Sequence, residues 1–559
     1  MASIQKKKVK GHTYYFAIET KRIDGKVHTV WSKHLGKAED LLRKLEAAEP
    51  PAPAMAKVFD FGAAAALYSI ARRWGLVEII NQHVSKRQQG LSVGEYMLIA
   101  AINRAVAPKS KRQIGEWFAS TSLRRWITVQ PEKLTSQRFW DHMSYLGADE
   151  IRAIEDDLLP RLLTEFGIDV RCLLYDATNF FTYIDSATPA QLPQRGHSKA
   201  KRDDLRQVSL ALLVSADFHV PLLHHVYPGN VPDSKEFAGF TDSLVQRYQR
   251  LAQHCQDITL VFDKGNNAGA NQQKLDESRL HFVGSLVPAQ YPDLLQVPLS
   301  EFAELVDPRC PGVSAYRVQL EVLGQERTVV VTYNDSLYLG QIQGLTLHLK
   351  KAAAALKELQ RRLLSGTGKP ASVKSVQQQV DAITRAQYLA GIISTTITEE
   401  QGRPRLSFTI DHDAIHRLTE TSFGKTLLFT DRSDWATADI VAAYRGQIAI
   451  EDAFKEMKDP QYLSWSPLYH WTDQKIRVHA FYCVLALTLS TLLRREAHRL
   501  GVDMSLQALF DELTEIREVA VIYPHVDGVR YRDHMTLTPR NPVQEKLFQA
   551  LDLQRYALS

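Results

Sequence analysis

Cysteine is scarce in this sequence: its 559 residues include four, far apart, and none is paired with another cysteine or a histidine at zinc-finger spacing. A disulfide framework and a structural zinc site are therefore disfavoured, as is typical of the reducing cytoplasm. The N-terminal lysines precede no apolar stretch, so we expect no signal peptide. The most apolar run, 478–493, is shorter than the roughly 20 residues of a membrane span. We expect it to form a buried core helix, with no membrane partner.

The composition is also without strong bias. It is 45% apolar and 23% charged, with 28 Gly and 23 Pro, which excludes disorder, collagen and simple repeats. At about 150 residues per domain, the length predicts three to four domains, one of which can be inserted in another.

Positive charge is concentrated in the first quarter of the chain. Residues 1–50 carry 11 Lys and Arg against 6 acids, 11 − 6 = +5, which equals the net charge of the whole chain. Residues 81–140 carry 10 against 3, or +7. Two basic blocks favour a polyanionic partner such as nucleic acid. A solvated surface is the alternative.

Hydrophobic periodicity divides the chain. Alternating residues at 13–19 and 27–31 predict strands, and the prolines at 50–53 predict a linker. Helical spacing with basic turns runs from 61 to about 166, where Lys109, Lys111 and Arg112 are candidate DNA contacts. The predicted organisation is a small basic strand-rich module (1–50), a linker (51–60), a helical DNA-binding domain (61–166), a core (167–296 and 424–495) interrupted by an insertion (297–423), and a C-terminal region (496–559).

The core has the pattern of a mixed α/β sheet. Apolar strands are predicted at 171–176, 208–214, 220–226 and 258–263, with a helix at 234–254 before the last of them. The insertion has strands at 316–322 and 328–333 and a helical pair at 345–364 and 373–388. That pair is a solvated hairpin, a dimer contact or a DNA clamp, and the sequence does not choose among these.

Two acids end strands of this predicted sheet. Asp176 and Asp263 leave neighbouring strand ends, from which carboxylates can share a divalent cation; taken alone, each is also a common turn or cap residue. In the predicted helix 436–458, Tyr444, Glu451 and Lys458 recur every seven residues and so lie on one face. Glu451 can close a three-carboxylate site, with Tyr444 and Lys458 holding phosphate oxygens. An exposed face with incidental charge is the alternative.

Several sequence blocks resemble a known family. The segment YRGQIAIEDAFKEMK (444–458) is similar to the Y-x2-R-x3-E-x6-K signature of bacterial insertion-sequence transposases of the DDE type. The segments YDATNF (175–180), YPGNVPDS (227–234) and VFDKGN (261–266) are similar to the blocks around the two aspartates of that family, and 194–202 and 468–479 also resemble it. The similarity covers 173 to about 493, with its blocks in the family's order.

The resemblance implies an RNase H-like catalytic core and a metal-dependent DNA transposase. Asp176, Asp263 and Glu451 would be both the catalytic residues and the ligands of two Mg²⁺ ions, with Mn²⁺ as a substitute. The partners would be double-stranded DNA, both transposon ends and target, and a second copy of the chain in a homodimer or larger assembly. The location would be the bacterial cytoplasm, at the nucleoid.

Further residues are candidate DNA contacts. The basic loop between the first two core strands would lie beside the metal site. Trp471 and Tyr469 could stack on an unpaired base, although aromatics at this density are more often part of a core. With the residues above, the candidates for DNA or phosphate binding are Tyr444, Arg445, Lys458, Arg195, His197, Lys199, Lys201, Arg202, Lys109, Lys111, Arg112 and Trp471.

One position departs from the signature, because Gln447 stands where the family has arginine. Gln447 cannot supply a cation to a phosphate, so Arg445 or a residue outside the helix would replace it. Two other functions remain open: a catalytically silent DNA-binding protein derived from a transposase, and an RNase H-like nuclease that cleaves without joining.

Overall fold

A computed structural model describes most of the chain. The described residues are 2–23, 26–46, 52–86, 89–185, 187–196, 202, 204–232, 235–237, 239, 247, 257–266, 269–365, 371–400, 402–466, 468–526, 529–530 and 533–558. The predicted helix 234–254 lies almost entirely outside them, as do His197, Lys199 and Lys201. The chain forms two compact units: residues 1–65, 119–126 and 510–559, and residues 66–118 and 127–509.

The described residues of the first unit form three small antiparallel sheets, the smallest of which pairs β17 (His525–Val526) with β18 (Val529–Arg530). The N-terminal sheet joins β1 (Ala2–Val9), β2 (His12–Ile23) and β3 (Lys26–Gly36), followed by α1 (Ala38–Glu46). The second sheet joins β19 (His534–Leu537), β16 (Arg517–Ile522) and β4 (Met55–Asp60). Strand β4 corrects the linker expected at 51–60. Its partner β16 lies more than 450 positions along the chain, so no local pattern indicates the pairing.

A mixed nine-stranded sheet is the centre of the second unit. The strand order is β10-β11-β12-β15-β9-β8-β5-β6-β7, with β5, β8 and β9 parallel and the other neighbours antiparallel. The expected α/β fold with a mixed sheet is therefore confirmed. The strands are β5 (Cys172–Thr182), β6 (Arg206–Ser215), β7 (Pro221–Pro228), β8 (Thr259–Val261), β9 (His281–Ser285), β10 (Ala303–Glu304), β11 (Val313–Val322), β12 (Gln325–Asn334) and β15 (Lys425–Thr430).

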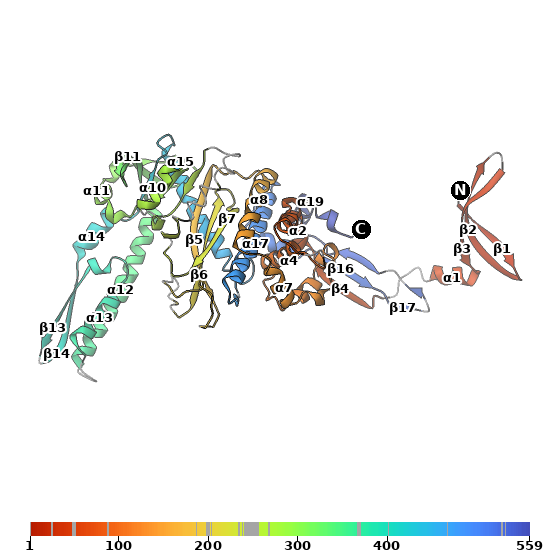
Figure 1. The fold of residues 1–559 in the computed structure, drawn as a ribbon, viewed down its shortest axis with the longest axis horizontal. Helices are drawn as coiled ribbons and strands as arrows, with labels where there is room; N and C mark the ends of the chain where they lie inside the picture. Colours follow the sequence, from red (N-terminus) through yellow and green to blue (C-terminus); the bar gives the residue numbers. More distant parts are fainter. Residues whose placement is uncertain are drawn as a thin grey trace. The chain divides into compact units, whose positions relative to one another are not determined.

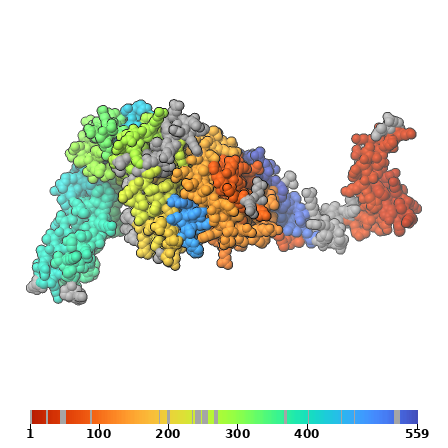
Figure 2. Space-filling view, in the orientation of Figure 1, coloured from red at the N-terminus to blue at the C-terminus, as the bar shows by residue number. Residues whose placement is uncertain are grey.

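The residues expected to form the insertion contribute to two structures. Strands β11 and β12 join the large sheet, where β12 pairs with β15. The rest forms an arm that projects from this sheet (Figures 1 and 2), built from α12 (Asp335–Ser365), α13 (Val373–Thr384), β13 (Ile393–Glu400), β14 (Arg403–Ile410) and α14 (His412–Thr421). The arm has its own apolar cluster, in which Leu356, Leu359 and Val376 are buried.

Helices cover the sheet near β7. Helix α17 (Asp473–Arg499) packs against α4 (Val93–Val106), α8 (Ala148–Phe166) and β7. It is long and apolar enough to cross a membrane, but 94% of its most apolar window is buried inside the protein, so the expectation of a core helix is confirmed. The remaining α-helices of the described residues are α2 (Gly62–Trp74), α3 (Leu76–Gln82), α5 (Ile114–Ala119), α6 (Leu123–Trp126), α7 (Ser136–Met143), α10 (Gly269–Glu277), α11 (Pro292–Leu295), α15 (Thr437–Arg445), α16 (Gln447–Glu456), α18 (Leu506–Thr514) and α19 (Pro542–Ala550).

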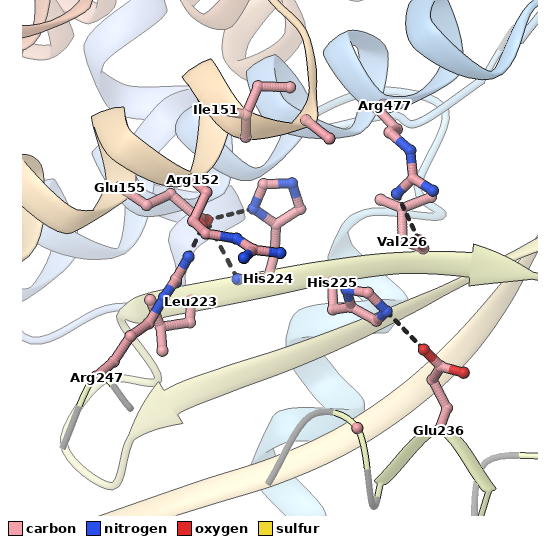
Figure 3. Close-up of a pocket in the computed structure, with 12 residues that line it drawn as sticks. Ile151, Arg152, Glu155, Leu223, His224, His225, Val226, Glu236, Arg247 and Arg477 are labelled. Atoms are coloured by element: carbon pink, nitrogen blue, oxygen red, sulfur yellow. Dashed lines mark hydrogen bonds and ion pairs between the residues drawn. The ribbon is translucent and has the colours of Figure 1, made fainter. Parts of the chain in front are cut away.

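Side chains form hydrogen bonds with backbone groups on the outer edge of β7, the last strand of the sheet (Figure 3). The backbone N–H of His224 donates to Glu155 Oε1 at 3.2 Å, and Arg477 Nη1 donates to the Val226 carbonyl at 2.8 Å. These bonds use backbone groups that an open edge would offer to another strand. A cavity of about 310 Å³ lies beside them.

Glu155 is the charge at the centre of this edge. It is buried, and it accepts from the His224 ring and from Arg247 at 3.3 Å. Burial acts to raise the pKa of Glu155, but His224 and Arg247 outweigh it and hold the pKa below its usual value.

We predict that Glu155→Gln destabilises the protein by about 3 kcal/mol at pH 7, because it removes the buried carboxylate that accepts from the His224 ring and from Arg247, and leaves Arg247 with Asp156 as its acidic partner. A carboxylate with a depressed pKa stabilises the folded state above its ordinary pKa, and this contribution disappears as the pH falls through the folded-state value. The difference between wild type and variant should therefore shrink below pH 4.5 in urea titrations. Asp157→Asn, which removes an exposed partner of His83, is the control and should cost less than about 1 kcal/mol. Equal costs for both variants would contradict the prediction.

Candidate functional site

The parallel pairing of β5 with β8 brings Asp176 and Asp263 to the same level of the sheet. Leu174 of β5 is in register with Val261 of β8, and each aspartate follows two residues later. Side chains two positions apart on a strand share a face, and neighbouring strands lie about 4.8 Å apart. The predicted adjacency is thus accounted for, although β5 continues past Asp176 to Thr182 because its antiparallel partner β6 extends that far.

Hydrogen bonds hold one oxygen of Asp263. Its Oδ1 accepts from the Lys264 backbone N–H at 2.7 Å, from Ser285 Oγ at 3.1 Å and from the Tyr444 hydroxyl at 3.0 Å. Tyr444 also lies 2.8 Å from Ser285 Oγ. Burial, reinforced by the charge of Asp263, raises the pKa of Tyr444, so the phenol stays protonated and can donate. Tyr444, expected to hold phosphate, contacts the aspartate in this structure.

Glu451 reaches the same cavity from helix α16. The expected single helix is divided at Gly446, so Tyr444 belongs to α15 and Glu451 to α16. A cavity of about 340 Å³ is lined by the three acids and by Tyr444 and Arg445. The rest of its lining consists of Val313, Thr332, Asn334, Leu337, Thr426, Leu428, Val441 and Gln447. Carboxylates from three separate elements therefore line one cavity that is otherwise partly apolar.

The donor set suits a hard divalent cation, since carboxylate oxygens are the ligands that Mg²⁺ prefers. Within the described residues, no three His, Cys, Asp or Glu side chains are close enough to share one metal ion. The chemistry of the three acids thus fits the metal that the resemblance implies.

Two cations of the signature segment have local contacts. Lys458 Nζ donates to Thr178 Oγ1 of β5 at 2.7 Å and lies 5.3 Å from the centre of the Phe180 ring. Arg445 lines the acid cavity, and its buried Nη1 has no hydrogen-bond partner among the described residues. The Arg445 guanidinium also interacts with Cys310, so Nη1 is an unpartnered buried donor of a residue that lines the cavity.

The three candidate DNA contacts before α5 have different environments. Lys109 and Arg112 are exposed, as expected. Lys111 differs, because its ammonium is enclosed: Nζ donates to the Tyr482 hydroxyl at 2.7 Å and lies 3.1 Å from His470 Nε2. Burial, together with the charge of nearby Arg104, lowers the pKa of Lys111 to about 7. Sequence spacing does not reveal this, since Tyr482 and His470 lie some 360 positions away.

The other candidates lie on the surface. Arg195 is exposed, and Arg202 forms a bidentate ion pair with Asp204 at 2.8 Å. Trp471 is 58% exposed and meets Trp140 edge to face, with ring centres 5.8 Å apart. Exposure leaves Arg195 and Trp471 accessible to a ligand.

Sequence reasoning missed two hydroxyls. Ser285 ends β9 and bonds Asp263, and Thr178 follows Asp176 by two residues and bonds Lys458. Neither carries a distinguishing local signal, because serine and threonine are frequent at strand ends. Knowledge that β9 neighbours β8 would have directed attention to Ser285.

The fold and the cavity define an α/β protein in which a mixed sheet and helix α16 place three carboxylates around one cavity. The family described as Transposase DDE domain matches residues 171–489. That match spans more than half of the chain, and the chain belongs to this family.

Solved structures show only slight likeness. The cryo-EM structure of a piggyBac transposase synaptic complex with hairpin DNA has a TM-score of 0.36 at 8% identity, over 80% of this chain and 79% of that one. A Mos1 transposase paired-end complex with the left transposon end has a TM-score of 0.16 at 14% identity, over 38% and 62%. Both scores are too low to support a conclusion. No curated protein matches the sequence significantly.

We predict that the stability of the wild type increases relative to Lys111→Met as the pH rises from 7 toward 10. The folded-state pKa of Lys111 lies below its ordinary 10.5, so the unfolded chain binds more protons in this window and each rise in pH favours folding. The slope should approach about 1.4 kcal/mol per pH unit in denaturant titrations. The matched variant Lys109→Met, at an exposed position, should show no such slope, and a slope in both would contradict the enclosure of Lys111.

Proposed function

We propose that this protein is a DDE transposase that binds the terminal inverted repeats of an insertion sequence and catalyses metal-dependent DNA cleavage and strand transfer. The observation that carries the proposal is the convergence of Asp176, Asp263 and Glu451 on one cavity inside the family-matched segment. Phosphoryl transfer that is assisted by metal ions bound to carboxylate oxygens needs no nucleophilic protein side chain. The sheet would then be the RNase H-like core of the enzyme, with the arm from α12 to α14 as its insertion.

The three acids would hold two divalent ions, with Mg²⁺ proposed and Mn²⁺ as a substitute. When bound, such ions activate the attacking hydroxyl and stabilise the leaving 3′ oxygen. The attacking group would be water for strand cleavage and the freed DNA 3′-hydroxyl for strand transfer.

The neighbouring side chains have positioning and binding roles. Tyr444 and Ser285 fix the Asp263 carboxylate by donating to Oδ1. Arg445, with a spare buried donor at the cavity, is proposed as the phosphate contact that replaces the signature arginine. Lys458, beside Thr178, can reach the DNA backbone at the strand that carries Asp176.

The DNA would be double-stranded, comprising both transposon ends and target. Lys109, Arg112, Arg195 and Arg202 are proposed backbone contacts, with Lys199, Lys201 and His197 from the same loop, and Trp471 is proposed to stack on an unpaired base. Joining two ends requires two active sites, so we propose a homodimer or larger assembly, at the nucleoid of a bacterial cytoplasm.

We predict that Asp176→Asn, Asp263→Asn and Glu451→Gln each abolish Mg²⁺-dependent cleavage of a DNA end taken from beside the gene, while DNA affinity stays within about twofold. A carboxamide keeps the shape of the side chain but removes the charge that a divalent ion requires. Asp452→Asn is the matched control, since Asp452 is exposed beside Glu451 and pairs with Lys455; it should retain cleavage.

The wild-type products distinguish the alternatives. Joined products that require Glu451 support the transposase. Cleavage without joining favours the nuclease, and binding without cleavage under any divalent ion favours a silent DNA-binding protein.

We predict that Lys109→Ala and Arg112→Ala each weaken DNA binding and reduce the slope of log affinity against log salt by about 1, because each removes one phosphate contact. Fluorescence anisotropy at several salt concentrations measures both quantities. Lys133→Ala, another exposed cation of the helical block, serves as the comparison. Unchanged affinity in both Lys109→Ala and Arg112→Ala would mean that DNA binds to another part of the protein.

A further inference from the structure

Gln447, the residue that departs from the family signature, lies in the interior of the protein. It is the first residue of α16 and is only 8% exposed. The chain approaches closely here: a Cβ added to Gly446 would lie 3.3 Å from Leu174 Cδ2 of β5. Glycine at 446 thus lets the start of α16 contact the sheet directly.

The Gln447 side chain bonds two strands at once. Its Nε2 donates to the Val261 carbonyl of β8 at 2.7 Å and to the Tyr175 carbonyl of β5 at 3.1 Å. The parallel pairing of these strands ends at Leu174 and Val261. The Tyr175 carbonyl lies one residue beyond it and needs a donor from elsewhere, and the carbonyl of Val261, in the last pair, has a second lone pair that can accept. A carboxamide has two N–H groups on one nitrogen and can satisfy both without burying a charge.

These bonds connect all three acid-bearing elements. Tyr175 immediately precedes Asp176, and Val261 lies two residues before Asp263. Glu451 is one helical turn after Gln447, and residues four apart lie on the same face of a helix. We infer that Gln447 is a positioning residue, which fixes α16 to β5 and β8 and so sets the placement of Glu451 relative to the two aspartates.

This inference rests on the proposed function, because its consequence is measured at the metal. A group that orients metal ligands without touching the ion typically contributes about 10- to 100-fold to metal affinity or activity. The departure from the signature at position 447 is therefore compatible with catalysis. The Gln447 side chain positions the carboxylates instead of contacting phosphate.

The test compares Gln447→Met, which keeps the length but removes both donors, with wild type. Mn²⁺ binding to the full-length protein without DNA is followed by the electron paramagnetic resonance signal of free Mn²⁺. We expect the Mn²⁺ concentration for half-saturation to rise by about tenfold or more, cleavage to recover partly at high Mn²⁺, and DNA affinity to stay within about twofold. Gln461→Met, at an exposed glutamine of the same unit, is the control and should match wild type.

A second variant covers the possibility that Gln447→Met fails to fold. Gln447→Asn keeps the amide but is one methylene shorter, so we expect a smaller rise in the Mn²⁺ requirement. A purely structural role would lower the melting temperature of both variants with an unchanged Mn²⁺ midpoint, and that result would overturn the inference. If Glu451→Gln also leaves Mn²⁺ binding and cleavage unchanged, the proposed function fails; if Glu451→Gln removes them and Gln447→Met does not, only the positioning role fails.

Discussion

The parallel pairing of β5 with β8 is the constraint on which the site depends. It extends over three residues, from Cys172 and Thr259 to Leu174 and Val261, and fixes Asp176 and Asp263 at equivalent positions. The pairing is buried on both sides, as parallel strands require, and β6 and β9 complete the sheet around it. A slip of one residue would turn one of the aspartates to the opposite face. The register of these apolar strands therefore determines where the two aspartate charges lie in the cavity.

How far the sequence predicts this arrangement depends on the range of the interactions. The hairpin of β6 and β7 and the strand before Asp263 follow from local apolar runs and their turns, and the structure contains them. The family signature identifies Glu451 because its spacing from Tyr444 and Lys458 is a local property of the chain. Pairings between remote segments have no such signature, which is why β4, whose partner is β16, was expected to be linker.

The same limit applies to individual charges. Lys109, Lys111 and Arg112 are indistinguishable in sequence, yet the Lys111 ammonium is enclosed by His470 and Tyr482 of a distant segment. A cation can be buried when hydrogen-bond acceptors surround it, and burial then lowers its pKa and keeps it from phosphate. Charge counting over a window therefore detects a basic region but cannot assign its members to surface or interior.

Gln447 shows the opposite case, in which a departure from a pattern has a structural reason. Judged by charge alone, loss of the signature arginine suggests a weakened phosphate site. The Tyr175 carbonyl lies just past the point where the β5–β8 ladder ends and requires a donor, and the Gln447 amide donates to it and to the Val261 carbonyl of the last pair. The strand pairing that aligns the aspartates also ends at this point, so the carboxylates reach the cavity where the Tyr175 carbonyl has no further partner in the β5–β8 ladder. Gln447 donates to that carbonyl, and this bond fixes the position of the helix that carries Glu451.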